Sequence, residues 1–166
     1  MGNGIPPILH DYRNGKITWQ QLEGIDYDLL GYFLSCHLIV EHYLNGYLKT
    51  SFPELRWNNA RLSFGQKISL VSKEKFPDRY NCVPAIKHLN SLRNKISHNI
   101  DYIISLKDLD PLIKYIEKST DGKAEIPSET NKIIELFTTL VCAWFAGYIA
   151  SQVNHSKLTM DNGACD

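Results

Sequence analysis

Three side chains with complementary chemistry lie close together in residues 89–99, whose sequence is LNSLRNKISHN. Arg93 carries a guanidinium group that can hold a phosphate. Asn94 carries an amide that can orient a substrate through hydrogen bonds. His98 carries an imidazole that can take up or release a proton near neutral pH. Together these groups can hold a phosphate, orient a substrate and transfer a proton.

The same segment has the apolar spacing of an amphipathic helix. The residues that recur every three or four positions, and would form one stripe facing a core, are Leu89, Leu92, Ile96 and Ile100. On an ideal helix Arg93 and His98 are about 140° apart around the axis and about 7.5 Å apart along it, whereas Asn94 and His98 share a face. Arg93 and His98 can therefore meet on one ligand only if the helix kinks, or if another helix or a second subunit closes the groove.

A long helix is predicted upstream, from the N-cap candidate Asp26 to about Lys49. Its apolar stripe consists of Leu30, Phe33, Leu34, Leu38, Leu44 and Leu48. His37 and Glu41 are four residues apart on or beside this stripe, where an ionisable group needs a partner. Two alternatives follow. Either the two side chains hydrogen-bond to each other or lie at the edge of the stripe, or Glu41 reaches Arg93 and His98 from a neighbouring helix.

The rest of the chain also predicts helices and no strand. A shorter helix is expected over residues 60–73, and Pro84 suits the first turn of the helix that carries the trio, which we extend to about residue 105. A short helix should follow Asp108 or Asp110, and an apolar last helix should run from Ser128 to Val153. We therefore predict an all-α, up-and-down bundle of four to five main helices.

The two ends of the chain differ from this middle part. Five Gly and Pro residues predict an extended arm over residues 1–16, and a short helix is expected at residues 19–23. The polar residues 154–166 are expected to form a disordered tail. The organisation is then an arm (1–25), a helical domain (26–153) and a tail (154–166).

Charge and cysteine usage limit the class of protein. The net charge is zero, but residues 56–95 contain nine Lys or Arg against two acidic residues, a pattern compatible with one basic face for a polyanion or with ordinary solvated charges. The four cysteines lack the close pairs of a zinc site, so we expect no metal, no cofactor and no disulfide framework. Cys36 and Cys142 are expected to be small buried hydrophobic residues.

The N-terminus has no signal-peptide pattern and no uninterrupted apolar run approaches about 20 residues, which predicts a cytoplasmic protein without a membrane span.

Several segments together resemble one known family. Residues 38–48 read LIVEHYLNGYL, residues 63–70 read SFGQKISL and residues 89–100 read LNSLRNKISHNI, followed by an apolar final helix. This order resembles the HEPN superfamily, the all-α "higher eukaryote and prokaryote nucleotide-binding" domains. Their signature is an Arg followed directly by a polar residue, with a His separated from the Arg by four to six residues. Here these are Arg93, Asn94 and His98, with four residues between Arg93 and His98. The resemblance spans about residues 26–153.

The resemblance implies a function and a set of site residues. Active members are metal-independent endoribonucleases that work as homodimers, with both motifs facing a shared cleft. By this likeness His98 would act as base or acid on the 2′-hydroxyl or the leaving oxygen, Arg93 would bind the scissile phosphate, and Asn94 would orient either one. Some members add an acidic residue from the first helix, here Glu41. The basic span, with Lys67, Lys87 and Lys95, would then track the RNA backbone.

Other interpretations of the trio stay open. Arg93 could pair with an acidic residue of another helix, and His98 could cap the end of its own helix. Many family members are non-catalytic nucleotide-binding or protein-interaction modules. A catalytic site should leave Arg93 and His98 exposed at a groove, whereas a module should bury or pair them.

For a nuclease, the family implies a toxin–antitoxin or phage-defence setting, with a neutralising partner such as a nucleotidyltransferase-like antitoxin.

Overall fold

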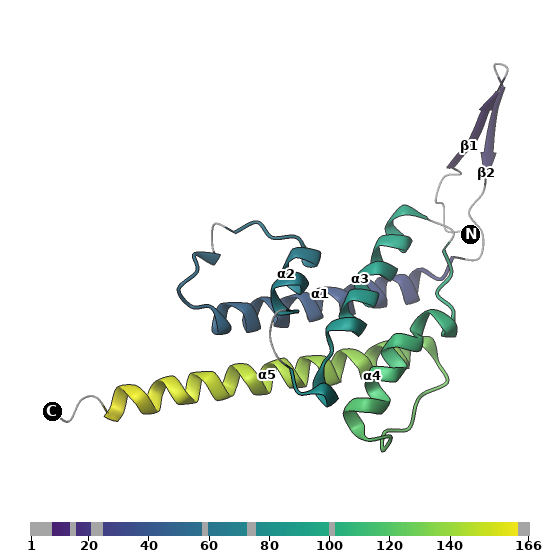
Figure 1. The fold of residues 1–166 in the computed structure, drawn as a ribbon. Coiled ribbons are helices and arrows are strands. Elements are labelled where there is room, and N and C mark those ends of the chain that lie inside the picture. Colours follow the sequence, from purple (N-terminus) through teal and green to yellow (C-terminus); the bar gives the residue numbers. More distant parts are fainter. Residues whose placement is uncertain are drawn as a thin grey trace.

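The structure is a computed structural model that describes residues 8–13, 16–20, 25–57, 60–72, 76–99 and 102–162. Five α-helices and one β-hairpin account for most of these residues. Helices α1 (Tyr27–Ser51) and α5 (Thr130–Asn162) lie side by side and run in the same direction, while α3 (Val83–His98) crosses α1 (Figure 1). The prediction of a mostly helical bundle is confirmed, and the hairpin is the exception to it.

Helix α1 begins where the sequence predicts. The Asp26 side chain accepts a hydrogen bond of 2.9 Å from the backbone N–H of Leu29, and the helix ends before Pro53, which cannot continue it. The predicted apolar stripe is partly wrong, because Leu34 and Leu38 are exposed. The face turned to the core instead consists of Phe33, Cys36, His37, Val40, Leu44, Tyr47 and Leu48. This set also repeats every three to four residues, so spacing alone could not select between the two faces.

Helix α2 (Phe64–Val71) is shorter than the predicted span of residues 60–73. Its start is set by a capping box, in which the Ser63 side chain accepts from the N–H of Gln66 and the Gln66 side chain accepts from the N–H of Ser63. These paired bonds begin the helix four residues later than the start at residue 60 that apolar spacing suggests.

Helix α3 carries the trio as predicted and has Pro84 in its first turn. Leu89 and Leu92 are fully buried, so the core stripe is confirmed at these positions. The expectation that the helix continues to about residue 105 is wrong, since it ends at His98. Residues 102–105 are irregular and lead into a 3-10 turn, η3 (Leu106–Leu109), where Ser105 and Asp108 form a second capping box.

Helices α4 (Asp110–Thr120) and α5 complete the bundle. Helix α5 continues to Asn162, so the expectation of a disordered tail is wrong for residues 154–162. No Pro or Gly, which would interrupt a helix, occurs between Gly147 and Gly163. Its segment Thr130–Asn154, with a mean hydropathy of 1.7, is long and apolar enough to cross a membrane by composition alone. Ile133, Phe137 and Val141 in this segment are fully buried in the bundle.

The N-terminal arm contains strands that the sequence did not predict. Strands β1 (Ile8–Arg13) and β2 (Lys16–Gln20) pair antiparallel and form a hairpin. The expected helix at residues 19–23 is therefore wrong at Trp19 and Gln20, and residues 21–23 lie outside the described part. Ile, Thr, Trp and Tyr favour strands, and the intervening dipeptide Asn14-Gly15 favours a tight hairpin turn. These local preferences outweigh the capping-box spacing of Thr18 and Gln21.

Candidate functional site

The trio lies on the last turns of α3 and is open to solvent. Arg93, Asn94 and His98 are all exposed, whereas Leu92 next to them is fully buried and fixes the rotation of the helix. Neither Arg93 nor His98 belongs to an ion pair within the part of the chain that the structure describes. The alternative in which Arg93 is neutralised by an acidic side chain is therefore not what the described residues show.

Arg93 and Asn94 line a cavity of about 470 Å³. Three helices form its walls: His37 and Glu41 come from α1, residues 62–65 from the start of α2, and Asn90 from α3 together with Arg93 and Asn94. The cavity thus joins the predicted site residues Arg93, Asn94 and Glu41. Asn90 and the start of α2 belong to it as well, although no sequence signal singled them out.

The start of α2 gives this cavity a positive wall. The first N–H groups of a helix have no partner in their own helix, and the helix dipole places a partial positive charge there. Among the first described residues of α2, Gln66 donates its N–H to the Ser63 hydroxyl and Lys67 donates its N–H to the Ser63 carbonyl oxygen. An added Cβ at Gly65 would meet nothing within 4 Å, so the backbone is accessible there. Together with the guanidinium of Arg93, this end of α2 suits an anion such as a phosphate.

His37 is the buried member of the cavity wall. Its side chain is only 5% exposed, and its ring centroid lies 4.3 Å from that of Phe64. Burial lowers the pKa of His37, and the nearby charge of Arg93 lowers it further, while a hydrogen bond with Asn90 and the charge of Glu41 act in the opposite direction. Nε2 of the ring has no hydrogen-bond partner among the described residues. His37 is therefore a neutral side chain near neutral pH, bonded to Asn90 rather than to Glu41.

Glu41 is bound by a lysine from another helix. Its Oε1 lies 2.6 Å from Nζ of Lys67, and both side chains are largely buried. Glu41 therefore enters the cavity as part of a neutral pair. Lys67, which we predicted as an RNA contact, is engaged within the chain. Lys87 and Lys95 are exposed on α3, with Nζ of Lys95 5.6 Å from the ring centroid of Tyr102.

His98 does not line the cavity that Arg93 and Asn94 line. It is the last residue of α3, and the helix reaches it without a break after Arg93, so the two side chains diverge as the ideal geometry predicts. No hydrogen bond from the imidazole to the last carbonyl groups of α3 is present among the described residues. One copy of the chain thus offers a cavity whose lining suits an anion and, separately, an exposed imidazole at the end of the same helix.

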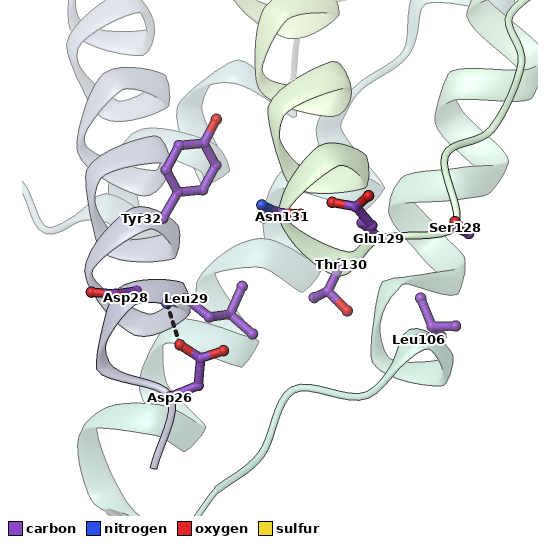
Figure 2. A pocket seen from close by; sticks show the side chains of 9 residues that line it. All are labelled: Asp26, Asp28, Leu29, Tyr32, Leu106, Ser128, Glu129, Thr130 and Asn131. Atoms are coloured by element: carbon purple, nitrogen blue, oxygen red, sulfur yellow. Dashed lines mark hydrogen bonds between the residues drawn. The ribbon is translucent and has the colours of Figure 1, made fainter.

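A second cavity has the opposite charge character. It lies where α1 and α5 begin, has a volume of about 640 Å³, and is lined by the carboxylates of Asp26, Asp28 and Glu129 (Figure 2). These carboxylates would repel a polyanion, so this cavity does not suit RNA. No group of three or more His, Cys, Asp or Glu residues that could hold a metal ion occurs in the described ranges.

Comparisons with known proteins add no relative: no protein-family model, no curated protein and no solved structure matches the chain. The function therefore has to be inferred from the residues of the site.

Proposed function

We propose that this protein is a metal-independent endoribonuclease of the HEPN type, with Arg93, Asn94 and His98 as its reactive residues. The observation that carries the proposal is the exposure of all three on the last turns of α3, with Arg93 and Asn94 at a cavity that suits a phosphate. A phosphate held by Arg93 and an imidazole brought to it from a second copy together provide the groups for phosphodiester chemistry.

The reaction requires RNA, because only RNA has an internal 2′-hydroxyl. The 2′-oxygen attacks the adjacent phosphorus, with His98 in one of two roles. As the base, His98 takes up the 2′-hydroxyl proton and water protonates the leaving 5′-oxygen; as the acid, His98 protonates the leaving 5′-oxygen and water takes up the 2′-hydroxyl proton. The bond from phosphorus to that 5′-oxygen breaks, which leaves a 2′,3′-cyclic phosphate and a 5′-hydroxyl end. Arg93 stabilises the charge that develops on the phosphoryl oxygens. Asn94 orients the phosphate or the imidazole through its amide.

Two copies of the chain are needed to complete this site. A phosphate in the cavity contacts Arg93 and Asn94, whereas His98 of the same copy lies outside the cavity. In a homodimer with the two α3 helices facing each other, His98 of one copy reaches the phosphate held by Arg93 of the other. The exposed Lys87 and Lys95 then contact the RNA backbone beyond the reacting phosphate.

Such an activity would damage the RNA of its own cell. The proposal therefore includes a toxin–antitoxin or phage-defence setting in the cytoplasm, with a neutralising partner such as a nucleotidyltransferase-like antitoxin. This part rests on the family resemblance alone.

The test compares wild-type protein with His98→Ala and Arg93→Ala on mixed RNA in EDTA, with analysis of the RNA ends. We expect wild type to produce 2′,3′-cyclic phosphates and both variants to lose at least about a hundredfold in rate, the size typical of a lost general acid or base. His42→Ala is the matched control, because His42 is also an exposed helical histidine. Equal cleavage by wild type and His98→Ala would overturn the proposal.

A non-catalytic nucleotide-binding or regulatory module is the second candidate. The position of His98 outside the cavity favours it, since the cavity can bind a nucleotide phosphate without the imidazole. In that case no RNA would be cleaved, and Arg93→Ala would abolish nucleotide binding while His98→Ala would leave it unchanged.

A further inference from the structure

A groove between α1 and α5, which lie side by side (Figure 1), is on the other side of α1 from the Arg93 cavity. Its volume is about 440 Å³, and its α1 wall consists of Tyr32, Cys36, Ile39 and Tyr43. At about 100° per residue, this wall lies about 150° around the helix from His37 and Glu41, which line the Arg93 cavity. The groove is therefore separate from the site of the proposed reaction.

The walls of this groove are apolar or uncharged. Ala143 of α5 is open to solvent there, and Cys36 and Cys142 form buried parts of the walls. Burial raises the pKa of Cys142 to about 11 and raises that of Cys36 as well, so both thiols stay protonated near neutral pH. Glu135, the carboxylate in the lining, lies 2.9 Å from Nζ of Lys132 and is paired with it. An uncharged molecule therefore suits this groove better than an ion.

The groove also contains a buried hydroxyl group. Thr138 lines it, is only 6% exposed, and its Oγ1 has no hydrogen-bond partner among the described residues. The hydroxyl lies near Cys36, where it offsets part of the rise that burial causes in the pKa of the thiol, but a thiol is a weak hydrogen-bonding group. Buried hydroxyl groups are normally hydrogen-bonded, and an unpaired one destabilises the free protein. A bound molecule that supplies a partner for Thr138 would remove that cost.

The groove has the size of a small-molecule site. Such sites measure about 300–1,000 Å³ and are mostly apolar, with a few polar groups that fix the orientation of the ligand. An enclosed apolar cavity of about 150 Å³ is enough for benzene, so a groove of about 440 Å³ accommodates a fused two-ring molecule. The rings of Tyr32 and Tyr43 in the lining provide aromatic surface for such a ligand.

We propose that the α1–α5 groove binds a small, uncharged aromatic molecule that carries a hydroxyl or carbonyl group, and that this group pairs with the hydroxyl of Thr138. The apolar and aromatic lining holds the rings. Thr138 makes the site selective, because a hydrocarbon of the same shape leaves the buried hydroxyl unpaired. This binding does not depend on the activity of α3, so it is tested separately from the proposed reaction.

The experiment follows the amide NMR signals of isotope-labelled protein during titration with 2-naphthol and with naphthalene, which share two rings and differ in one hydroxyl group. We expect saturable shifts at residues 36–43 and 138–146, and a preference of the protein for 2-naphthol. Thr138→Val should lower this preference at least about threefold, the size of one net hydrogen bond. Thr139→Val is the matched control: Thr139 also lines the groove, but its side chain is exposed, so the preference should remain.

A second pair of variants tests the location of the site. In Ala143→Trp the indole should fill the groove and weaken the binding of both probes at least about tenfold. Ala150→Trp is its control, because Ala150 is also an exposed alanine of α5 but does not line the groove. Circular dichroism checks that each variant is folded.

Three results would overturn the proposal: no saturable shifts up to the solubility of the probes, the same preference in wild type and Thr138→Val, or unchanged binding by folded Ala143→Trp. A wild-type dimer that Ala143→Trp dissociates without any probe, as measured by analytical ultracentrifugation, would overturn it as well. In that case a second copy of the chain, and not a small molecule, covers the groove.

Discussion

His37 is a titratable residue that the fold removes largely from water. It is almost fully buried in the cavity wall, bonded to Asn90, and burial keeps its pKa below the ordinary value of 6.5. The neutral form is therefore the one that fits the fold. Protonation would place a charge on a largely buried ring beside Arg93. This makes the fold itself sensitive to acid at one identifiable residue.

We predict that His37 makes stability fall as the pH drops below about 6.5. In that range the unfolded chain takes up a proton that the folded chain resists, so the free energy of unfolding decreases by at most about 1.4 kcal/mol per pH unit. Urea denaturation of wild type and His37→Leu measures the free energy of unfolding as a function of pH. The range from pH 5 to 8 brackets the unperturbed His pKa of about 6.5. The variant should show a shallower slope, and the exposed His42→Leu control should keep the wild-type slope. Equal slopes for wild type and His37→Leu would contradict the prediction.

Glu41 and Lys67 are predicted to act as a coupled pair that stabilises α1 against α2. Glu41→Gln and Lys67→Met should each cost about 1–3 kcal/mol, because each leaves a largely buried charge without its partner. The double variant should cost less than the sum, with a coupling of about 0.5–3 kcal/mol. Denaturant titrations of the four proteins give this cycle. If the pair is structural, RNA cleavage by the double variant should stay within about tenfold of wild type, and a larger loss would assign Glu41 to the reaction.

At the scale of elements, the segment that follows α3 is held by hydrogen bonds to the side chain of Asp108. The hydroxyl of Tyr102 donates to Oδ1 of Asp108 at 2.5 Å, and the hydroxyl and N–H of Ser105 donate to Oδ2. The bond to Asp108, together with burial, raises the pKa of Tyr102 to about 12. Burial alone would raise the pKa of Asp108, but the bonds from Ser105 and Tyr102 outweigh it and lower that pKa. His88 of α3 contacts the Asp108 carbonyl at 2.6 Å, which ties this turn back to the helix.

We therefore predict that Asp108→Ala lowers stability by about 1–2 kcal/mol, the size of a lost capping side chain. The exposed neighbour Lys107→Ala should change stability by less than about 0.5 kcal/mol. Thermal and urea unfolding provide the comparison. A change for Asp108→Ala as small as that for Lys107→Ala would show that the Asp108 side chain does not stabilise the turn after α3.

The elements that follow from local rules were predictable from the sequence, and those that depend on distant partners were not. The Asp26 cap, the proline in the first turn of α3 and the buried Leu89 and Leu92 are local or periodic features. The end of α3 at His98 was not predictable, because the apolar spacing of the sequence continues past it through Tyr102 and Ile103. The core face of α1 was only partly predictable, because two overlapping apolar faces satisfy the same spacing.

The same distinction holds for the candidate site. The motif singled out Arg93 and Asn94 from the sequence, and the structure places both, with Glu41, at one cavity. The contribution of Asn90 and of the start of α2 follows only from the way three helices meet. So does the pairing of Glu41 with Lys67, since nothing in the sequence relates residues 26 positions apart.

At the scale of the whole molecule, the separation of His98 from the Arg93 cavity predicts how subunits complement each other. In a two-fold dimer whose sites each combine Arg93 of one copy with His98 of the other, a heterodimer of Arg93→Ala and His98→Ala chains has one site with both residues intact and one with neither. Random mixing of equal amounts makes half of the dimers heterodimers, so the mixture should recover about a quarter of the wild-type RNase activity.

Each variant alone should be inactive, and Arg93→Ala mixed with the Arg93→Ala/His98→Ala double variant should stay inactive, because no site in that mixture regains both residues. Cleavage should appear only after the copies have had time to exchange, so activity followed from the moment of mixing reports subunit exchange as well. If Arg93 and His98 of one copy act together, every heterodimer has two damaged sites and no activity returns. Recovery in the first mixture and none in the second thus separates a shared site from a site within one chain.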